Sequence, residues 1–165
     1  MKKNILVILL LISTSSCGIY SLNGASIPPN AKSISVSYFN NQANTINPNL
    51  SSTFTEKLKD IFIQQTNLNL IEKNGDLSFS GFISKYEIKP ISIQANETAA
   101  QNRLTISINV TYENKFEQNN NFTKMFSRYK DYNSSQNLTD IEESLVNEIT
   151  NEIVEDIFNK SVVNW

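Results

Sequence analysis

The feature that most constrains the fold is a run of alternating apolar and polar residues in the second half of the chain. From Leu104 to Phe116 the apolar side chains share one parity. The polar positions between them include Thr105, Ser107, Asn109 and Thr111. This period of two predicts a β-strand with one buried face. At about 3.4 Å per residue, the span 103–117 predicts a strand of up to about 48 Å. A partner strand is expected over 122–132.

Two segments carry apolar residues at helical spacing. The longer one, 139–162, places isoleucine or leucine at four-residue steps from Ile141 to Ile157. Thr139 and Glu142 have the spacing of a capping box at its start. The shorter one, 50–66, follows Pro48 and has Asn49 or Ser51 as its expected cap. Both segments therefore predict amphipathic helices that pack against a sheet.

Two further strands are expected before and after the first helix. Ile34, Val36 and Tyr38 alternate with serines, which predicts a strand with one buried face. From Leu77 to Pro90 the apolar parity changes once, and a glycine at such a change is typical of a β-bulge, so Gly81 is the predicted bulge.

The order strand, helix, strands, helix predicts an α+β fold. We expect two helices packed on one face of a mixed, mostly antiparallel sheet of about four strands. The other face carries Ser, Thr and Asn, with no second apolar layer to cover it. That polar face is either plain solvent surface or a docking surface.

The first residues have the pattern of a bacterial lipoprotein export signal. Lys2 and Lys3 precede the apolar run 5–12, which is too short to cross a bilayer core that requires about 20 residues. Small residues then lead to Cys17. We interpret 1–16 as a cleaved signal peptide, 17–31 as the lipidated cysteine with a flexible tether, and 32–165 as a single domain.

Cys17 is the only cysteine in the chain. The alternative, a buried free thiol, is awkward in an exported protein, since the thiol has no disulfide partner. Lipidation of Cys17 predicts a firm membrane anchor, because each buried CH₂ of an acyl chain contributes about 0.8 kcal/mol.

Charge and composition exclude several functional classes. Without Lys2 and Lys3, twelve basic residues stand against sixteen acidic ones, a net charge of −4, which argues against nucleic acid as a partner. The chain has no histidine, which excludes Ser-His-Asp, Cys-His and the common zinc sites. The acids of the last helix lie on its polar side, so we expect no carboxylate pair. We therefore expect no enzyme, no metal site and no cofactor other than the lipid on Cys17.

Two groups of side chains on the predicted strands admit more than one interpretation. The aromatic residues lie mostly on apolar parities, which favours core packing over binding of sugars or acyl chains. The basic residues form a patch suited to phosphate groups, or are ordinary solvated strand residues. The candidates for lipopolysaccharide contact are Lys85, Lys89, Arg103, Arg128 and Lys130.

The chain as a whole resembles the lipopolysaccharide-assembly lipoprotein family, LptE. The resemblance rests on short stretches in the family's order. They are Cys17-Gly18-Ile19-Tyr20-Ser21, Gly24, Ser26-Ile27-Pro28, Phe39-Asn40-Asn41, Asn47-Pro48, Leu50-Ser51, Phe54-Thr55-Glu56-Lys57-Leu58, Asn74-Gly75-Asp76-Leu77, Gly81, Asn96-Glu97-Thr98-Ala99-Ala100, Asn102-Arg103-Leu104 and Phe126-Ser127-Arg128-Tyr129.

This resemblance implies a lipoprotein on the periplasmic side of the outer membrane, held there by its lipid anchor. It implies a role as the plug and assembly partner of an LptD-type β-barrel that inserts lipopolysaccharide into the outer leaflet. The polar positions Thr105, Ser107, Asn109 and Thr111 are then the candidate face for docking to the barrel. The alternative is a stand-alone periplasmic lipoprotein module that binds a glycan or a peptide on its open sheet face.

Overall fold

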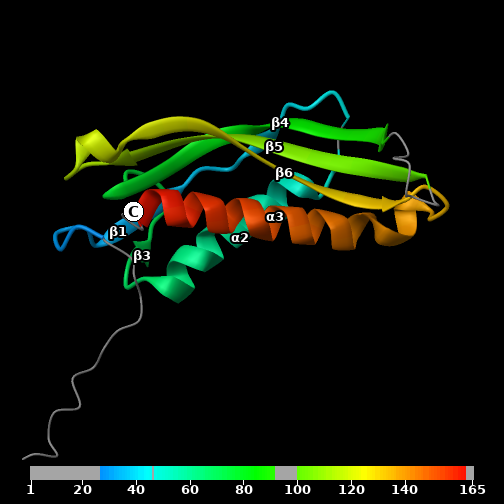
Figure 1. Ribbon diagram of the computed structural model, residues 1–165. Helices are drawn as coiled ribbons and strands as arrows, with labels where there is room; N and C mark the ends of the chain where they lie inside the picture. Colours follow the sequence, from blue (N-terminus) through cyan, green and yellow to red (C-terminus); the bar gives the residue numbers. More distant parts are fainter. Residues whose placement is uncertain (1–26, 46, 92–99, 163–165) are drawn as a thin grey trace, which may run out of the picture.

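A mixed sheet lies over two helices that both cover the same face (Figure 1). The computed structural model describes residues 27–45, 47–91 and 100–162. The predicted signal peptide, Cys17, most of the predicted tether and the 96–99 part of the family-like stretch lie outside the described residues.

The described elements follow one another as two strands, a helix, three strands, a 3-10 turn, a further strand and a final helix. They are β1 (Ser33–Val36), β2 (Asn40–Asn41), α2 (Leu50–Gln65), β3 (Asn69–Leu70), β4 (Leu77–Ile91), β5 (Gln101–Asn114), the 3-10 turn η1 (Gln118–Asn120), β6 (Phe122–Asn133) and α3 (Leu138–Val162). The predicted α+β class is therefore confirmed. The sheet has six strands and not four, because it also contains β2 and β3, two strands of only two residues each.

The long strands form an antiparallel meander, and the short strands add parallel pairs at one edge. The order is β3-β1-β4-β5-β6, with β2 paired to β4 beyond the end of β1. Strand β1 pairs in parallel with β3 and β4, and β2 pairs in parallel with β4, whereas β4-β5 and β5-β6 are antiparallel. The predicted mixed, mostly antiparallel sheet is thus confirmed, and β6 is left as one of its edges.

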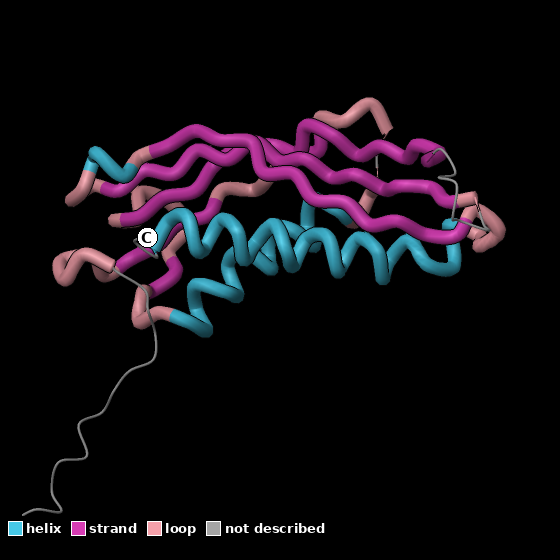
Figure 2. The backbone as a smooth tube through the Cα atoms, viewed as in Figure 1, coloured by secondary structure: helices cyan, strands magenta, loops and turns pink. Residues whose placement is uncertain are grey.

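The core lies between the sheet and the helices (Figure 2). The even-numbered apolar residues of β5, from Leu104 to Tyr112, are all buried, as the alternation predicts. The stripe of α3 from Leu145 to Val162 is buried opposite them. With 25 residues, α3 is about 37 Å long, so it runs along most of the long meander.

The predicted bulge is real but lies three residues further along than expected. Gly81 stays in register with Val110, and the shift falls between Ile83 and Lys85. Ile83 is fully buried, whereas Phe82 lies on the open face in register with Asn109. The prediction was wrong because it took Phe82, and not its neighbour Ile83, as the core residue.

Gly81 is required for a different reason. A Cβ atom built on it would lie 2.0 Å from the backbone oxygen of Asn109 and 2.7 Å from Cε1 of Phe39, and its φ is +153°. The ring of Phe39 thus takes the place of a side chain on β4. Phe39 is fully buried. Tyr38, predicted to be on the buried face of the first strand, is 56% exposed instead, because β1 ends at Val36.

The N-cap residue of α2 is Asn49, one of the two predicted positions, but its side chain makes no capping hydrogen bond. The side-chain oxygen of Asn47 instead accepts from the backbone N–H groups of Asn49 and Leu50, each at 3.0 Å. The side-chain oxygen of Asn137 accepts from the N–H of Thr139 at 3.2 Å at the start of α3. Asparagine placed just before a helix satisfies free N–H groups as well as serine or threonine does. Glu142 is therefore not needed for a capping box.

Glu142 instead joins the start of α3 to the sheet. Its carboxylate accepts hydrogen bonds from the hydroxyl of Tyr86 on β4 and, at 2.8 Å, from the side-chain amide of Asn47. Burial, followed by the hydrogen bond to Glu142, raises the pKa of Tyr86 above its ordinary value. Tyr86 thus stays neutral and donates its proton to Glu142.

Within the described part of the chain, each helix falls short of the length and apolarity that a membrane span requires.

Candidate functional site

The face of the sheet away from the helices is the main candidate for a binding surface. Its side chains are set in rows across β4, β5 and β6, because residues paired in an antiparallel sheet project on the same side. Arg103 lies between Lys89 and Asp131, and Thr105 lies between Glu87 and Tyr129. These two rows occupy the end of the sheet where β4 finishes and β5 begins.

The next rows continue along the same face toward the opposite end of the sheet. Ser107 lies between Lys85 and Ser127, and Asn109 lies between Phe82 and Met125. Thr111 follows, with its hydroxyl 3.0 Å from that of Thr123. The four positions predicted to form the barrel-docking face, Thr105, Ser107, Asn109 and Thr111, therefore do share one face on the central strand.

The exposure of these four side chains is limited by their neighbours on the edge strands. Ser107 is only 2% exposed and its hydroxyl lies 2.8 Å from that of Ser127. Thr105, Asn109 and Thr111 are partly buried. A partner that docks here would contact mainly the longer side chains of β4 and β6.

The open face is also less polar than the sequence predicted. Met125 is 57% exposed and Tyr129 is 51% exposed, and both project from β6 on the open side. The guanidinium carbon of Arg103 lies 3.7 Å from the centroid of the Tyr129 ring, a cation–π contact. Tyr129 was expected in the core. The parity of β6 contained the signal, since Tyr129 falls out of step with the buried Phe126.

The five predicted basic residues do not form one surface. Lys85, Lys89 and Arg103 lie on the open face, whereas Arg128 and Lys130 are in register with the core residues Ile106 and Leu104 and so project on the helix side. The register of the sheet thus divides a patch that looked continuous in the sequence.

The three cations on the open face share two carboxylates. Glu87 lies 3.1 Å from the Lys89 ammonium and 3.7 Å from that of Lys85. Arg103 binds Asp131 through two hydrogen bonds of 2.7 and 2.8 Å. The hydrogen bond from Lys89 holds the pKa of Glu87 low, and that from Arg103 does the same for Asp131. These five charges leave one net positive charge, and we call them the cationic cluster.

Arg128 and Lys130 are occupied by acids of α3. Arg128 makes two 2.7 Å hydrogen bonds to Asp156, and the ammonium of Lys130 lies 2.7 Å from Glu152 and 3.4 Å from Glu148. These contacts raise the pKa of both cations. They fasten the edge strand β6 to the polar side of α3, so the acids of that helix are partly paired and not simply solvated.

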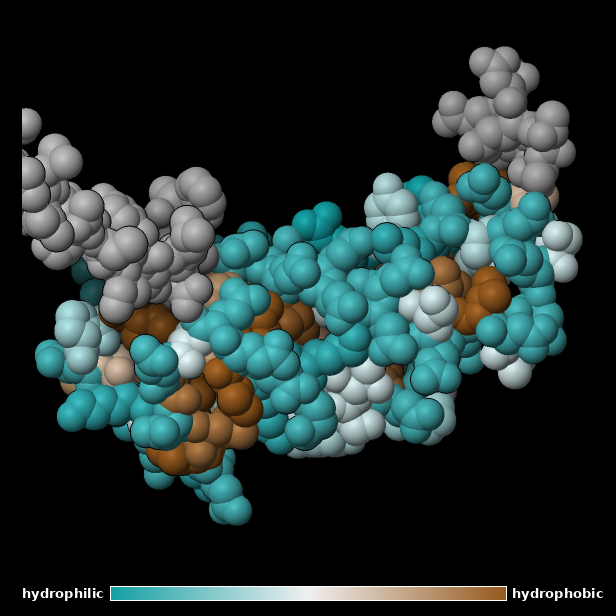
Figure 3. Space-filling model, turned by 90° about the horizontal axis from the view of Figure 1, so that it is seen from below, coloured by the Kyte–Doolittle hydropathy of each residue, from teal (hydrophilic) through white to brown (hydrophobic). Residues whose placement is uncertain are grey.

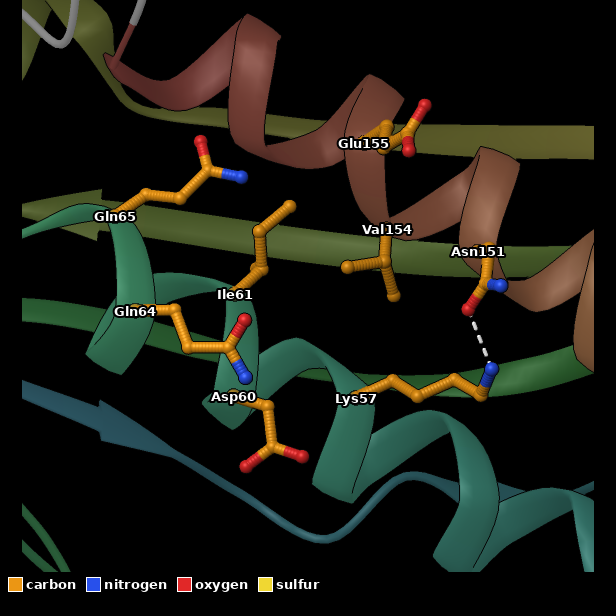
Figure 4. Close-up of a pocket in the computed structure, with 8 residues that line it drawn as sticks. All are labelled: Lys57, Asp60, Ile61, Gln64, Gln65, Asn151, Val154 and Glu155. Carbon is orange, nitrogen blue, oxygen red and sulfur yellow. Dashed lines mark hydrogen bonds between the residues drawn. The ribbon is translucent and has the colours of Figure 1, made fainter. Parts of the chain in front are cut away.

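A groove between the two helices is one of several concave features, with a volume of about 310 Å³ (Figure 4). Lys57 of α2 reaches across it and donates to the side chain of Asn151 on α3. Burial lowers the pKa of Lys57. Asp60 and Glu155 lie on opposite sides of the groove (Figure 4), so the two acids are not paired for general acid–base chemistry.

In residues 27–45, 47–91 and 100–162, the acidic and sulfur side chains do not form a group of three or more that could hold a metal ion. The open face of the sheet presents polar, aromatic and cationic side chains together, which makes it the candidate binding surface.

Comparison with known proteins identifies the family. The profile of the family described as LptE, lipopolysaccharide-assembly, matches residues 31–161, most of the chain. No protein of curated function matches the sequence at a significant level.

Among the solved structures that are similar to this fold are two at very low sequence identity. A homolog of the neuraminyllactose-binding hemagglutinin from Helicobacter pylori is 9% identical with a TM-score of 0.53, and the match covers 86% of this chain and 88% of that one. The rare lipoprotein B from Shewanella oneidensis is 11% identical with a TM-score of 0.50, and the match covers 76% of this chain and 91% of that one. At these identities the likeness shows the fold alone.

Proposed function

Because the chain belongs to the lipopolysaccharide-assembly family LptE, we propose that it is an outer-membrane lipoprotein that serves as the plug and assembly partner of an LptD-type β-barrel. The family is one of assembly lipoproteins that depend on no cofactor, and its members are not enzymes. In this proposal the protein is attached on the periplasmic side through a lipid on Cys17, and it assists the insertion of lipopolysaccharide into the outer leaflet.

The observation that carries the proposal is the open face of a sheet whose other face is covered by helices. Its central row of small polar residues from Thr105 to Thr111 suits contact with the wet interior of a large barrel. Met125 and Tyr129 add exposed apolar area, which strengthens such an interface. The glycan-binding alternative has only fold-level support, from the Helicobacter pylori structure.

The cationic cluster is the proposed contact for lipopolysaccharide. Phosphate groups attract arginine and lysine, and Lys85 and Lys89 keep 49% and 69% of their side chains exposed. Arg103 is already held in place by Asp131 and the ring of Tyr129, so little side-chain entropy remains to be lost on binding. Arg128 and Lys130 stay secondary candidates, because they project on the helix side of β6 and not on the open face with the cationic cluster.

The first test is affinity purification of the tagged, lipidated protein from outer membranes, followed by mass spectrometry. We expect one large β-barrel in near equal amount. Recovery of the protein alone would overturn the assembly proposal and favour the stand-alone module.

The docking face is tested by charge insertion with a matched control. We expect Thr105→Arg and Thr111→Arg together to abolish recovery of the barrel, since both project from the open face. The control Ser144→Arg with Asn159→Arg adds the same two positive charges at exposed positions on α3 and should leave recovery unchanged. Equal recovery with all variants would refute docking through this face.

Lipopolysaccharide contact is tested by reversing charges. Lys85→Glu with Lys89→Glu should weaken binding of purified protein to lipopolysaccharide about tenfold or more, whereas Lys124→Glu, an exposed lysine on the helix-side parity of β6, should not. If Lys124→Glu weakens binding as much, binding reflects overall charge and not the cationic cluster.

A further inference from the structure

One end of the domain collects exposed aliphatic side chains that the proposed function does not use. Ile63 in the last turn of α2 is 49% exposed, and Leu70 of β3 and Ile71 after it are each 40% exposed. We call these three residues the aliphatic patch. Seen from the helix side, most of the surface is hydrophilic, but hydrophobic residues gather over the end of the molecule where α2 finishes and β3 lies (Figure 3).

The pairing of β3 explains why these side chains come together. Leu70 is in register with Ile34, whose side chain is buried toward the helices, so Leu70 lies on the helix side of the sheet edge. The connection from α2 to β3 is short, so Ile63 in the last turn of α2 lies close to β3. β3 is an edge strand, so this side of the patch has no further strand beside it in the described part of the chain.

The chain enters the domain at this same end. The backbone N–H of Asn69 on β3 donates to the carbonyl oxygen of Lys32 at 2.9 Å, and Ile27 and Ala31 pack against the core. Only nine residues lie between Cys17 and Ile27. At no more than about 3.6 Å per residue, the ten steps hold Ile27, and with it this end of the domain, within about 36 Å of Cys17.

The turn between β5 and β6 adds a second group to this end of the domain (Figure 1). Lys115 donates to the carbonyl oxygen of Asn74 at 2.8 Å, which holds the turn beside the segment that follows β3. Phe116 in that turn is 47% exposed. The lysines at this end, Lys32, Lys73 and Lys115, are matched by three acids, Glu72, Asp76 and Glu117, so the charge is mixed and balanced.

We propose that the aliphatic patch rests on the surface of the lipid bilayer to which the protein is anchored. The inference depends on the proposed lipid anchor at Cys17. The tether brings this end of the domain to the membrane at high local concentration, so that even weak insertion of a few aliphatic side chains is sufficient. The domain would then stand on its β3 end, with the cationic cluster at the far end of the long strands, away from that bilayer surface.

The test places a tryptophan reporter on each of two surfaces. In a Trp165→Phe background, Ile63→Trp reports on the aliphatic patch and Met125→Trp reports on the open face, where the native side chain is equally exposed. The full lipidated protein is reconstituted into vesicles of phosphatidylethanolamine and phosphatidylglycerol with brominated acyl chains. We expect strong quenching of fluorescence at position 63 and little at position 125. Equal quenching at the two positions, or none at 63, would overturn the proposal.

The anchor itself is checked separately by intact mass. If the mass shows no acyl chains, the proposed anchor fails. The same two reporters are then compared after coupling the mature chain, through the single thiol of Cys17, to a maleimide lipid in the vesicles. Quenching at 63 alone would support the patch even though the natural anchor had failed, and no difference between the reporters would refute it.

A second measurement does not rely on the anchor. In a Cys17→Ser chain without the signal peptide, Ile63→Ser, Leu70→Ser and Ile71→Ser together should lower partitioning into the same vesicles about tenfold or more, since apolar area is lost at three half-exposed positions. Met125→Ser with Tyr129→Ser removes a comparable exposed apolar area from the open face; it is the control and should leave partitioning unchanged. A drop of the same size in both variants would contradict a patch-specific contact.

Discussion

Substitution of Gly81 by alanine tests the packing of β4 against β5 and the loop after β1. The added Cβ would meet the backbone oxygen of Asn109 at 2.0 Å and the ring of Phe39 at 2.7 Å. Ordinary contacts of a Cβ atom are longer than 3.0 Å, so both contacts have to lengthen, the one with the backbone oxygen by about 1 Å and the one with the ring by less. The backbone oxygen belongs to the central pairing of the sheet, and a φ of +153° adds strain for any residue with a side chain.

We expect Gly81→Ala to lower the free energy of unfolding by about 2–4 kcal/mol, the range for strain and overpacking in a core. Urea denaturation of the mature domain, followed by far-UV circular dichroism, measures it. Ser80→Ala is the matched control, because Ser80 is the exposed neighbour on the same strand and should change stability by less than about 0.5 kcal/mol.

The double variant with Phe39→Leu separates the two contacts. A smaller side chain at position 39 relieves the contact with the ring but not the one with the Asn109 oxygen, so the double-mutant cycle should show only partial compensation. Full compensation would show that the ring alone opposes the Cβ. A loss below about 0.5 kcal/mol for Gly81→Ala would refute the packing argument altogether.

Three further variants test the core, the sheet–helix link and the start of β1. Ile153→Ala, at a fully buried position of α3, should lower the free energy of unfolding by about 2–5 kcal/mol in the same urea assay. Tyr86→Phe should lower the free energy of unfolding by about 1–3 kcal/mol, because the Glu142 carboxylate loses a hydrogen-bond donor. An unchanged free energy of unfolding would show that water replaces the hydroxyl. The carboxylate of Asp76 accepts hydrogen bonds from the N–H and the hydroxyl of Ser33. The pKa of Asp76 is lowered mainly by the N–H of Lys32 and next by the Ser33 hydroxyl. The stability that Asp76 contributes is therefore present above its unfolded pKa and is lost as the pH falls through the lower folded pKa. Asp76→Asn should therefore flatten the acid side of the stability–pH profile below about pH 4, and an unaltered slope there would contradict the assignment.

The elements themselves were predictable because each depends on a local pattern. The alternation in 104–116 gave a strand at Gln101–Asn114, and the apolar steps in 139–162 gave a helix at Leu138–Val162. The expectation that Thr105, Ser107, Asn109 and Thr111 share the uncovered face followed from the same periodicity. Such patterns persist because a side chain's direction along a strand or a helix is fixed by the backbone.

The site was only partly predictable because pairing between strands is not local. Arg103 and Arg128 looked alike in the sequence, but the register of β5 and β6 puts one on the open face and the other beside Asp156. The bulge was misplaced for a related reason. Which of Phe82 and Ile83 enters the core depends on whether Phe39 fills the space beside Gly81.

The sequence by itself therefore determined the class of fold, the order of its elements, the buried faces of its long strand and long helix, and the lack of histidine chemistry. The tertiary structure decided which charges meet, which caps form and where the aliphatic patch lies. The physical reason is range: periodicity within one element sets the direction of its side chains, whereas ion pairs, bulges and surface patches arise only when segments distant in the chain are brought into register.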